Sequence, residues 1–527
     1  MPPFIKKSYS LVLLALIVFM VLALPAQSAA GKGKGKAKGR VRGGFFTAEE
    51  PFITLADGLP RGAKVKAIIS SGDELGDFLF EGLPDGIGIK PGEAKHTVDV
   101  YVAHEQTTIP FFNSRDFQDA SISKLTLTTK GGKRQGGVLD ASVALGPEAG
   151  FLRFCSASMA GPDEGLSDYI FFTGEETDDD GVIVPAGAPY GPDPFPGDGT
   201  RQGGYAVGLN TESGEFTQIA GMGRLNHENS IVVPGGWEGF TILTTDDTFN
   251  APSAQLYLYH APTEEDILGD GGSLFAFRVT GANGAAVDAA DPFNDANDYL
   301  DLGVGDEFSG EFIPVPDDIA DGTTGELPQD ALENWSNDNN VFQAIRLEDA
   351  AYDKNNPRIV YVADTGRTRI VPDPATGRMM RGPGGTVGMA DNGRIFKFVL
   401  NKHDPLVVDS VTVLADGDAV GSDVYVAFVN PDNIDTSKKS LMVQEDNDNA
   451  RVWQHRFKQG WWRVVATVND PDGESSGIVD ASKWFGGGTW LLDVQGHGEN
   501  VDEEVDDGGV TIKRESGQLL LMKIPAS

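Results

Sequence analysis

The sequence predicts an all-β fold, a β-propeller with long inserted loops. Composition is the first observation, because 67 glycines and 30 prolines in 527 residues disfavour long helices and favour strands joined by turns. Local pattern is the second, because after residue 45 short runs of β-branched and aromatic residues are bounded by Gly, Asp, Asn and Pro. Repetition is the third, since several of these runs end in the same way, at an acidic residue.

The first thirty residues predict a secretory signal peptide. Lys6 and Lys7 precede an unbroken apolar run at 11–24, and small residues follow this run. The run is shorter than the roughly 20 residues that a spanning helix needs, although an uncleaved N-terminal anchor is an alternative. No second long apolar run follows, and the Lys-Lys pair stands where a twin-arginine signal would have two arginines. We expect a mature chain without a membrane span that is secreted, periplasmic or held at the cell surface.

Residues 31–44 predict a flexible basic tether. Most of this segment reads GKGKGKAKGRVR and has no apolar periodicity. It is either a solvated linker or a contact for an acidic cell-wall polymer. The propeller is then expected to occupy residues 45–527 as a single domain, and we expect the protein to be a monomer.

The charge of the chain excludes several classes of partner. Lys and Arg number 42 against 78 Asp and Glu, so the net charge is −36. A surface this acidic argues against nucleic-acid binding and against docking on an anionic membrane. It suits metal cations instead. Cys155 is the only cysteine, which excludes an intrachain disulfide.

Acidic residues close several of the predicted strands in the same register. They are Glu105, Glu175, Asp246, Asp364 and Glu445. Their spacing exceeds the roughly 40–50 residues of an ordinary blade, so loops must be inserted, with 181–204 and 283–335 as candidates. Equivalent positions of successive blades converge on the central channel of a propeller. Grouped carboxylates repel one another unless cations compensate, and hard oxygen ligands suit Ca²⁺.

A metal-competent side chain also lies shortly before four of these acids. The four residues are Cys155, Glu228, Glu348 and Asp432. Any one of them alone is more simply a solvated or buried structural residue, and a lone cysteine is often a small buried apolar residue. Their recurrence before the acid-ended strands is what predicts a shared site.

An ordered series of segments resembles the PhoX-type alkaline phosphatases and their wider bacterial relatives, from about residue 95 to residue 500. The segments are FCSASMA at 154–160, FTGEET at 172–177, GRLNHEN at 223–229, TDD at 245–247, QLYLY at 255–259, RLEDAAYD at 346–353, QED at 444–446, ESSGIVD at 474–480 and WLLDVQGH at 490–497. This resemblance implies an exported six-bladed propeller. It also implies hydrolysis of phosphate monoesters at a cluster of iron and calcium ions at the channel mouth.

The resemblance also implies roles for particular residues. Cys155 matches an iron-ligating cysteine, and Arg346 would hold the phosphate of a small phosphorylated substrate. His227 would orient a neighbouring group, although a plain turn histidine is an equal alternative. With the acids of the shared register, the metal ligands expected are Cys155, Glu175, Glu176, Glu228, Asp246, Glu348 and Glu445. Gly174 departs from the cysteine that precedes the two acids in the closest PhoX sequences.

Two functions from different classes remain open at this point. One is a metal-dependent phosphatase with iron and calcium. The other is a propeller stabilised by Ca²⁺ alone that binds a ligand or partner without catalysis. Hydrolysis of another ester, such as a lactone or a phosphodiester, at the same centre is a third possibility. The chain shows neither the Gly-x-Ser-x-Gly turn nor a Walker-type phosphate loop, so a serine triad or P-loop mechanism is not indicated.

Overall fold

Four-stranded antiparallel sheets follow one another along the chain in the computed structural model, which describes residues 44–188, 190–195, 197–248, 254–291 and 296–525. Within these residues there are six such four-stranded units, two of which are joined into one larger sheet, and they are here called blades 1 to 6 in chain order. Blade 1 contains β5 (Pro84–Pro91), β6 (Thr97–His104), β8 (Ser121–Thr128) and β9 (Val138–Leu145). Blade 2 contains β10 (Phe154–Ala160), β11 (Ile170–Glu175), β14 (Tyr205–Asn210) and β15 (Phe216–Arg224).

Blades 3 and 4 are joined at their outer edges by one shared strand. Blade 3 contains β16 (His227–Val232), β17 (Phe240–Asp246), β18 (Leu256–Ala261) and β19 (Ser273–Ala282). Blade 4 contains β22 (Leu347–Asp353), β23 (Asn356–Asp364), β26 (Arg394–Leu400) and β27 (Val407–Asp416). Strand β21 (Phe308–Pro314) pairs with both β19 and β27, so the two blades form one continuous sheet.

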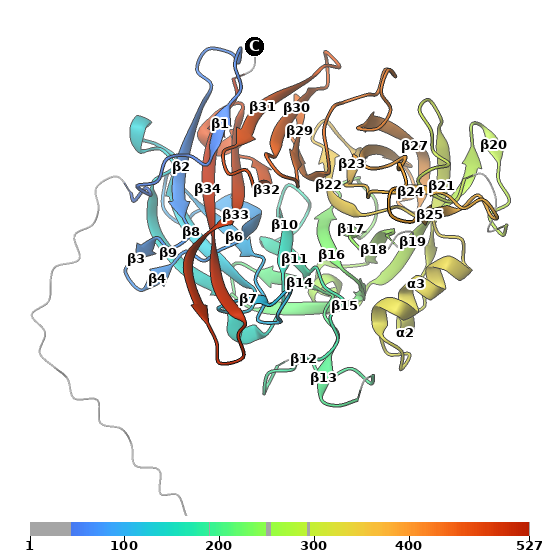
Figure 1. Ribbon diagram of the computed structural model, residues 1–527, viewed down its shortest axis with the longest axis horizontal. Coiled ribbons are helices and arrows are strands. Elements are labelled where there is room, and N and C mark those ends of the chain that lie inside the picture. Colours follow the sequence, from blue (N-terminus) through green and yellow to red (C-terminus); the bar gives the residue numbers. More distant parts are fainter. Residues whose placement is uncertain (1–43, 189, 196, 249–253, 292–295, 526–527) are drawn as a thin grey trace, which may run out of the picture. The chain divides into compact units, whose positions relative to one another are not determined.

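Blade 6 is completed by a strand from near the start of the described chain. Blade 5 contains β28 (Pro431–Thr436), β29 (Ser440–Glu445), β30 (Arg451–Arg456) and β31 (Trp462–Val468), and β1 (Ile53–Leu55) pairs with β31. Blade 6 contains β32 (Gly473–Asp480), β33 (Thr489–Val505), β34 (Thr511–Lys523) and β2 (Lys64–Ser70). Figure 1 shows the blue β2 beside the red β34, the pairing that closes the blade.

The first strand of each blade lies innermost, and these strands form a closed ring. Contacts run from β5 to β10, β16, β22, β28 and β32, and from β32 back to β5. A closed ring of blades removes the long free sheet edges that would otherwise pair with other chains. The described fold is therefore a six-bladed propeller, and the predicted all-β propeller class is confirmed.

The hydrophobic core lies between neighbouring blades. Alternate residues of a strand point to opposite faces of its sheet. Phe171 of β11 accordingly packs with blade 1 residues such as Tyr101, whereas Phe172 packs with blade 3 residues such as Ile242. Each pair of adjacent blades has a buried cluster of this kind. Both faces of a strand are thus buried, which explains why the strands read as continuous apolar runs.

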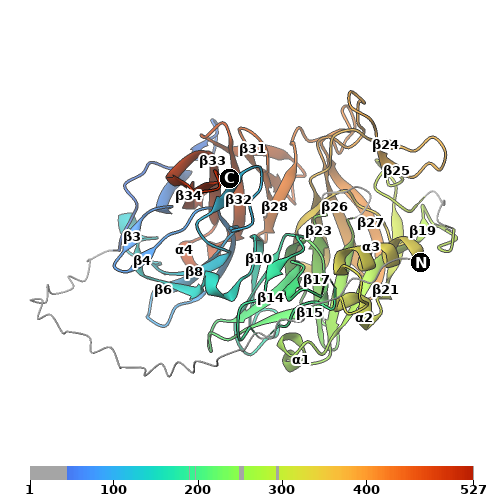
Figure 2. The same cartoon turned by 60° about the horizontal axis from the view of Figure 1, so that its bottom comes forward.

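The remaining elements are short insertions between strands. Paired short strands are β3 (Glu74–Leu75) with β4 (Phe78–Leu79), β12 (Val182–Ile183) with β13 (Thr200–Arg201), and β24 (Ile370–Pro372) with β25 (Met379–Arg381). Strand β7 (Ser114–Asp116) pairs with β34, and β20 (Ala285–Ala286) pairs with β19. The helices are α1 (Glu264–Leu268), α2 (Asp317–Ala320), α3 (Pro328–Asp338) and α4 (Ser482–Phe485), with 3₁₀ turns η1 (Gly132–Arg134) and η2 (Pro147–Ala149). Helices α2 and α3 lie against the outer strand β15 (Figure 2).

These insertions lie partly where the sequence predicts loops. Segment 181–204 holds β12 and β13, and segment 283–335 holds β20, β21, α2 and most of α3. The predicted signal peptide and nearly all of the predicted tether lie outside the described residues. Within the described residues, each helix is too short or too polar to cross a membrane.

Candidate metal centre

Each inner strand presents a polar side chain at the same place. In every blade the start of the inner strand pairs with the end of the second strand, as Phe154 does with Glu175 and His227 with Asp246. The residue that follows the paired position of the inner strand belongs to what we call the first ring: Asp85, Cys155, Glu228, Glu348, Asp432 and Glu474. In blades 1 to 5 the pairing register shifts directly after this position. Such bulges re-aim a side chain, here at one end of the channel.

A second ring comes from the residues that follow the paired end of each second strand. Its members are Glu105, Glu176, Asp247, Thr365, Asp446 and His497. Because the second strands lie beside the inner ones, both rings occupy the same end of the channel. Eleven of these twelve positions hold an acid, a thiol or an imidazole, groups that can bind a metal or carry a charge, and the exception is Thr365.

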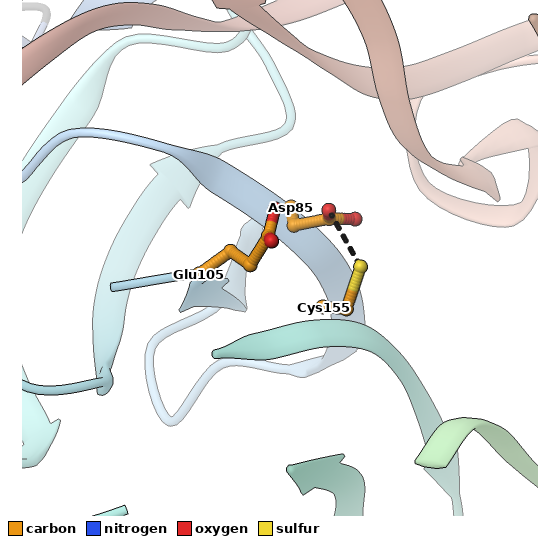
Figure 3. Close-up of side chains that lie close together, drawn as sticks. All are labelled: Asp85, Glu105 and Cys155. Atoms are coloured by element: carbon orange, nitrogen blue, oxygen red, sulfur yellow. Dashed lines mark hydrogen bonds between the residues drawn. The ribbon is translucent and has the colours of Figure 1, made fainter. Parts of the chain in front are cut away.

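Atoms of the two rings approach closely enough to share cations. Three groups have ligand atoms that all lie within 4.8 Å of one another: Asp85, Glu105 and Cys155; Cys155, Glu176 and Glu228; and Glu228, Glu348 and Asp432. Figure 3 shows the first group, in which the Cys155 Sγ lies 3.6 Å from the Asp85 Oδ2. Cys155 and Glu228 each belong to two groups, so the three groups form one connected cluster.

Several of these carboxylate oxygens are buried without a partner. Glu228 is 1% exposed, and neither of its carboxylate oxygens accepts a hydrogen bond from any described residue. The same is true of one oxygen each of Asp85 and Asp432. Burial of an unpaired carboxylate costs several kcal/mol, so such oxygens are normally paired or bound to metal. The donor set of carboxylates with one thiol therefore fits bound cations.

Electrostatics lead to the same interpretation. Burial raises the pKa of Glu228 well above its usual range, and the nearby charges of Asp432, Glu176 and Asp85 raise it further. Burial also raises the pKa of the Cys155 thiol, with added contributions from Glu176 and Glu228. Without cations, this environment favours the protonated forms of both groups. A bound cation reverses this effect, because it favours the carboxylate and the thiolate.

Arg346 supplies positive charge at the edge of the cluster. Its Nε lies 2.8 Å from the Asp247 Oδ1 and its Nη2 lies 2.6 Å from the Asp247 Oδ2, a two-point ion pair. The same Nη2 lies 3.3 Å from the Glu348 Oε1. Arg346 is thus held in place by one member of each ring, with its guanidinium beside the ligand groups.

His227 lies apart from the rings. Its Nδ1 is 3.0 Å from the Thr244 Oγ1 and its Nε2 is 2.9 Å from the Gly223 carbonyl oxygen. Burial lowers the pKa of His227 to about 4, so the ring is neutral at physiological pH. Both nitrogens are used inside the fold, and this geometry holds β16 to its neighbours without bringing the imidazole to the cluster.

Three of the predicted ligands turn away from the rings. Glu175 makes a two-point ion pair with Arg201, with both distances at 2.7 Å, and accepts a hydrogen bond from the Leu152 backbone N–H. Glu445 accepts hydrogen bonds from Arg451, from the Trp453 indole and from the Val429 N–H. These two acids brace the segment that leads into the inner strand of their own blade.

Asp246 and Asp364 are arranged in a similar way. Asp246 accepts a hydrogen bond from the Thr248 hydroxyl at 2.6 Å, and Asp364 accepts one from the Ile345 N–H at 2.9 Å. Neither belongs to the three ligand groups. Successive residues of a strand point to opposite sides, so the acid that closes the strand faces the fold and the next residue faces the channel.

Of the predicted metal ligands, the structure therefore brings together Cys155, Glu176, Glu228 and Glu348. It places Glu175, Asp246 and Glu445 outside the described ligand groups. The expected ligand set lacked Asp85, Glu105 and Asp432, which lie in those groups, and Asp247, which holds Arg346. The doubled acids Glu175-Glu176, Asp246-Asp247 and Glu445-Asp446 were the available signal, because only one of two neighbours can face the channel.

Fold and site together define a class of protein: a propeller with a buried cluster of carboxylates and one thiol at one end of its channel. Among solved structures, Pseudomonas fluorescens PhoX in complex with vanadate, a transition state analogue, is similar, with a TM-score of 0.60 and 15% sequence identity over 91% of this chain and 98% of that chain. The fold is thus PhoX-like.

A second solved structure is more distant. The GH93 α-L-arabinofuranosidase of Fusarium graminearum in complex with arabinobiose has a TM-score of 0.37 and 8% identity, over 86% of this chain and 97% of that chain. The chain matches no protein-family model and no curated protein sequence.

Proposed function

We propose that this protein hydrolyses phosphate esters at cations held by the two rings. The observation that carries the proposal is the connected cluster of Cys155, Glu228 and their neighbours, buried at one end of the channel with carboxylate oxygens unpartnered among the described residues. The PhoX-like fold supports it, since the similar structure was solved with vanadate, a transition state analogue.

Particular residues would hold the cations. Carboxylates of both rings, among them Glu228 and Glu348, suit Ca²⁺, which takes six to eight oxygen ligands. The Cys155 thiolate adds a soft donor that suits iron. When bound, such cations polarise phosphoryl oxygens and stabilise the charge that develops on them. Arg346 lies beside these groups and is positioned to donate hydrogen bonds to a phosphate oxygen.

The overall charge of the chain makes local compensation necessary. A phosphate ester carries about two negative charges at neutral pH, and a chain with a net charge of −36 repels it. The field near the rings becomes attractive once cations and Arg346 outweigh the ring carboxylates. Phosphate binding should therefore require the loaded site.

The first experiment combines metal analysis with an ester assay. The protein is purified without chelator, its iron and calcium are measured, and p-nitrophenyl phosphate hydrolysis is followed with added Ca²⁺. We expect both metals to be retained and the phosphate ester to be hydrolysed, with activity lost after chelation. Hydrolysis of a lactone or a phosphodiester in its place would reassign the substrate class, and metal-loaded protein inactive on all three would favour the non-catalytic, Ca²⁺-stabilised alternative.

Cys155→Ser separates the enzyme from a propeller stabilised by Ca²⁺ alone. A hydroxyl is harder and far less acidic than a thiol, so we expect the variant to lose its iron and at least about 100-fold in kcat while it keeps calcium and its melting temperature. Metal analysis, calorimetry and the ester assay measure these three properties. Unchanged iron content would show that Cys155 is not a ligand. The short distance from its sulfur to Asp85 already places the thiol among carboxylates.

Export is proposed on the sequence alone. The signal-peptide pattern at 1–30 suggests that the mature protein acts outside the cytoplasm, where Ca²⁺ is plentiful. N-terminal sequencing of the mature protein would identify the cleavage site.

A further inference from the structure

Three arginines lie on the insertion between β23 and β26, next to the rings. Thr365 of the second ring follows β23 directly, Arg367 and Arg369 come next, and Arg381 ends β25. The Arg367 N–H donates to the Ala390 carbonyl oxygen at 2.9 Å, and the Gly382 N–H donates to the Arg369 carbonyl oxygen at 2.8 Å. These backbone contacts fold the segment into a hairpin that keeps the three arginines close to one another.

Gly366 brings this hairpin close to the channel end. Its φ of +73° is a left-handed conformation that favours glycine, and a Cβ there would lie 2.4 Å from the Ala390 carbonyl oxygen. Its N–H donates to the Asp364 Oδ1 at 2.9 Å. The turn that carries Arg367 is therefore fixed to the end of β23.

None of the three guanidinium groups has an ion-pair partner among the described residues. No described carboxylate lies within 4.0 Å of their guanidinium nitrogens, although acids outnumber bases by 78 to 42 in the chain. The Asp391 Oδ1, which lies on the same insertion, accepts a hydrogen bond from the Arg369 backbone N–H at 2.9 Å instead. The Nη1 of the half-buried Arg367 is shielded from solvent and lacks a hydrogen-bond partner in the described structure. An N–H group of this kind is costly unless an acceptor binds to it.

The three arginines and Arg346 share one electrostatic field. Burial lowers the pKa of Arg367, and the positive charges of Arg381, Arg346 and Arg369 lower it further, while the charge of Asp247 raises it and offsets them in part. An anion bound among positive charges this close to one another would stabilise them. The positive region thus extends from Arg346, at the edge of the rings, to Arg381 on the exposed hairpin.

We propose that Arg367, Arg369 and Arg381 form a second anion site that binds a distal phosphate of the substrate. The inference rests on the proposed function and names its substrate class: phosphate esters that carry a second phosphate group, such as sugar bisphosphates. At the rings water attacks the first phosphate, the ester P–O bond breaks, and the leaving alkoxide takes a proton, so that an alcohol and inorganic phosphate form. The second phosphate stays intact on the arginines.

Arginine is suited to this role. Its planar guanidinium donates two parallel hydrogen bonds to a phosphate and stays charged in any environment. A substrate with one phosphate would occupy only the rings and Arg346. A substrate with two would span both sites and would fill the position in which Arg367 lacks a partner.

The test compares two substrates on metal-loaded protein. Fructose 6-phosphate and fructose 1,6-bisphosphate differ by one phosphate, and the ratio of their kcat/KM values measures the contribution of the second anion site. We expect wild type to prefer the bisphosphate, and R367Q and R381Q each to reduce that preference about tenfold. Arg134→Gln is the matched control, because Arg134 is an exposed arginine on η1, in the loop between the far ends of β8 and β9.

The outcomes separate the two proposals. An unchanged preference in both R367Q and R381Q would overturn the second anion site, and R381Q, at an exposed position, guards against loss of folding. If wild type hydrolyses neither sugar phosphate nor p-nitrophenyl phosphate, the proposed function fails. The second anion site is then tested by calorimetric binding of fructose 1,6-bisphosphate. Wild type should bind it at least about tenfold more tightly than R367Q, and equal affinities would refute the site.

Discussion

At the scale of single residues, two adjacent acids have opposite structural roles. Glu175 and Glu176 are consecutive acids, yet one is locked to Arg201 inside blade 2 and the other belongs to a ligand group with Cys155 and Glu228. Both side chains are buried, so burial alone does not separate a structural acid from a ligand. The distinction lies in the partners: Glu175 pairs with a cation inside the fold, whereas Glu176 lies mainly among like charges, those of Asp247 and Glu105, which Arg346 offsets only in part.

This contrast yields a matched pair of variants. Glu175→Gln leaves the buried Arg201 charge unpaired, and we expect a loss of roughly 3–5 kcal/mol in the free energy of unfolding with or without Ca²⁺. Glu176→Gln removes a repulsive charge, so the chelated protein should keep or gain stability while its stabilisation by Ca²⁺ shrinks. Urea unfolding with chelator and with Ca²⁺ measures both. Identical behaviour of the two variants would contradict the opposite roles.

At the scale of elements, the inner strands approach one another so closely that some positions accept only glycine. Gly86 of β5 follows Asp85 of the first ring, and a Cβ there would lie 2.1 Å from the Ala157 backbone nitrogen in β10. The backbones of blades 1 and 2 are thus in direct contact beside the group of Asp85, Glu105 and Cys155. The spacing of the first ligand group depends on this contact.

Gly86→Ala should therefore disturb both fold and site. We expect a loss of about 1–3 kcal/mol, typical of an overpacked core, together with weaker stabilisation by Ca²⁺ because Asp85 moves away from Cys155. Thermal unfolding with and without Ca²⁺ measures both effects. Gly191→Ala is the control, since no atom lies within 4 Å of its added Cβ. A Gly86→Ala protein as stable as this control would show that the strands separate freely.

The strands also show how much of the fold and of the candidate site could be predicted from the sequence. The apolar runs that end in acids correctly marked the second strands of blades 1 to 5, because burial on both faces leaves a strong pattern. The second strand of blade 6 was not predicted, because Gln495, Gly496 and His497 stand where the other blades have an acid. The expected ligand set held Glu175, Asp246 and Glu445, whereas it is the following residue that faces the channel in blades 2, 3 and 5; only in blade 2 was that residue, Glu176, in the set as well. The side of a strand that a residue faces depends on its pairing register, which the bulges shift and which no local pattern reveals.

At the scale of the whole molecule, the clustered acids make stability depend on pH. Burial raises the pKa of Asp349, next to the first ring, to about 8, and it raises the pKa of Glu228 and Glu348 well above their usual range. A group with a raised pKa in the folded state stabilises fully below its unfolded pKa of about 4, and this contribution is lost as pH rises through the folded value. The protein without metal should thus become less stable as the pH approaches 8.

Measurement between pH 7 and 8 captures this effect together with that of His497, whose raised pKa of about 9 makes stability fall over the same range. Burial lowers the pKa of His227 to about 4, so this histidine makes the free energy of unfolding rise with pH. That contribution is confined to pH values below about 6.5. With chelator present, we expect the free energy of unfolding to fall by on the order of 1 kcal/mol over this unit of pH for Asp349 alone. Saturating Ca²⁺ should reduce the part of this pH dependence that comes from Glu228 and Glu348. A stability that rises from pH 7 to 8 in chelator would contradict the protonated cluster.

The pairing of β2 with β34 has a consequence for biosynthesis. Residues 64–70 leave the ribosome early, but their partners at 511–523 are among the last described residues to be made. The ring cannot close until that late segment emerges, and the two rings of side chains draw on every blade. Such distant pairing is slow to form and leaves earlier blades exposed in the meantime. Blade 6 therefore becomes complete only after residues 511–523 have been synthesised.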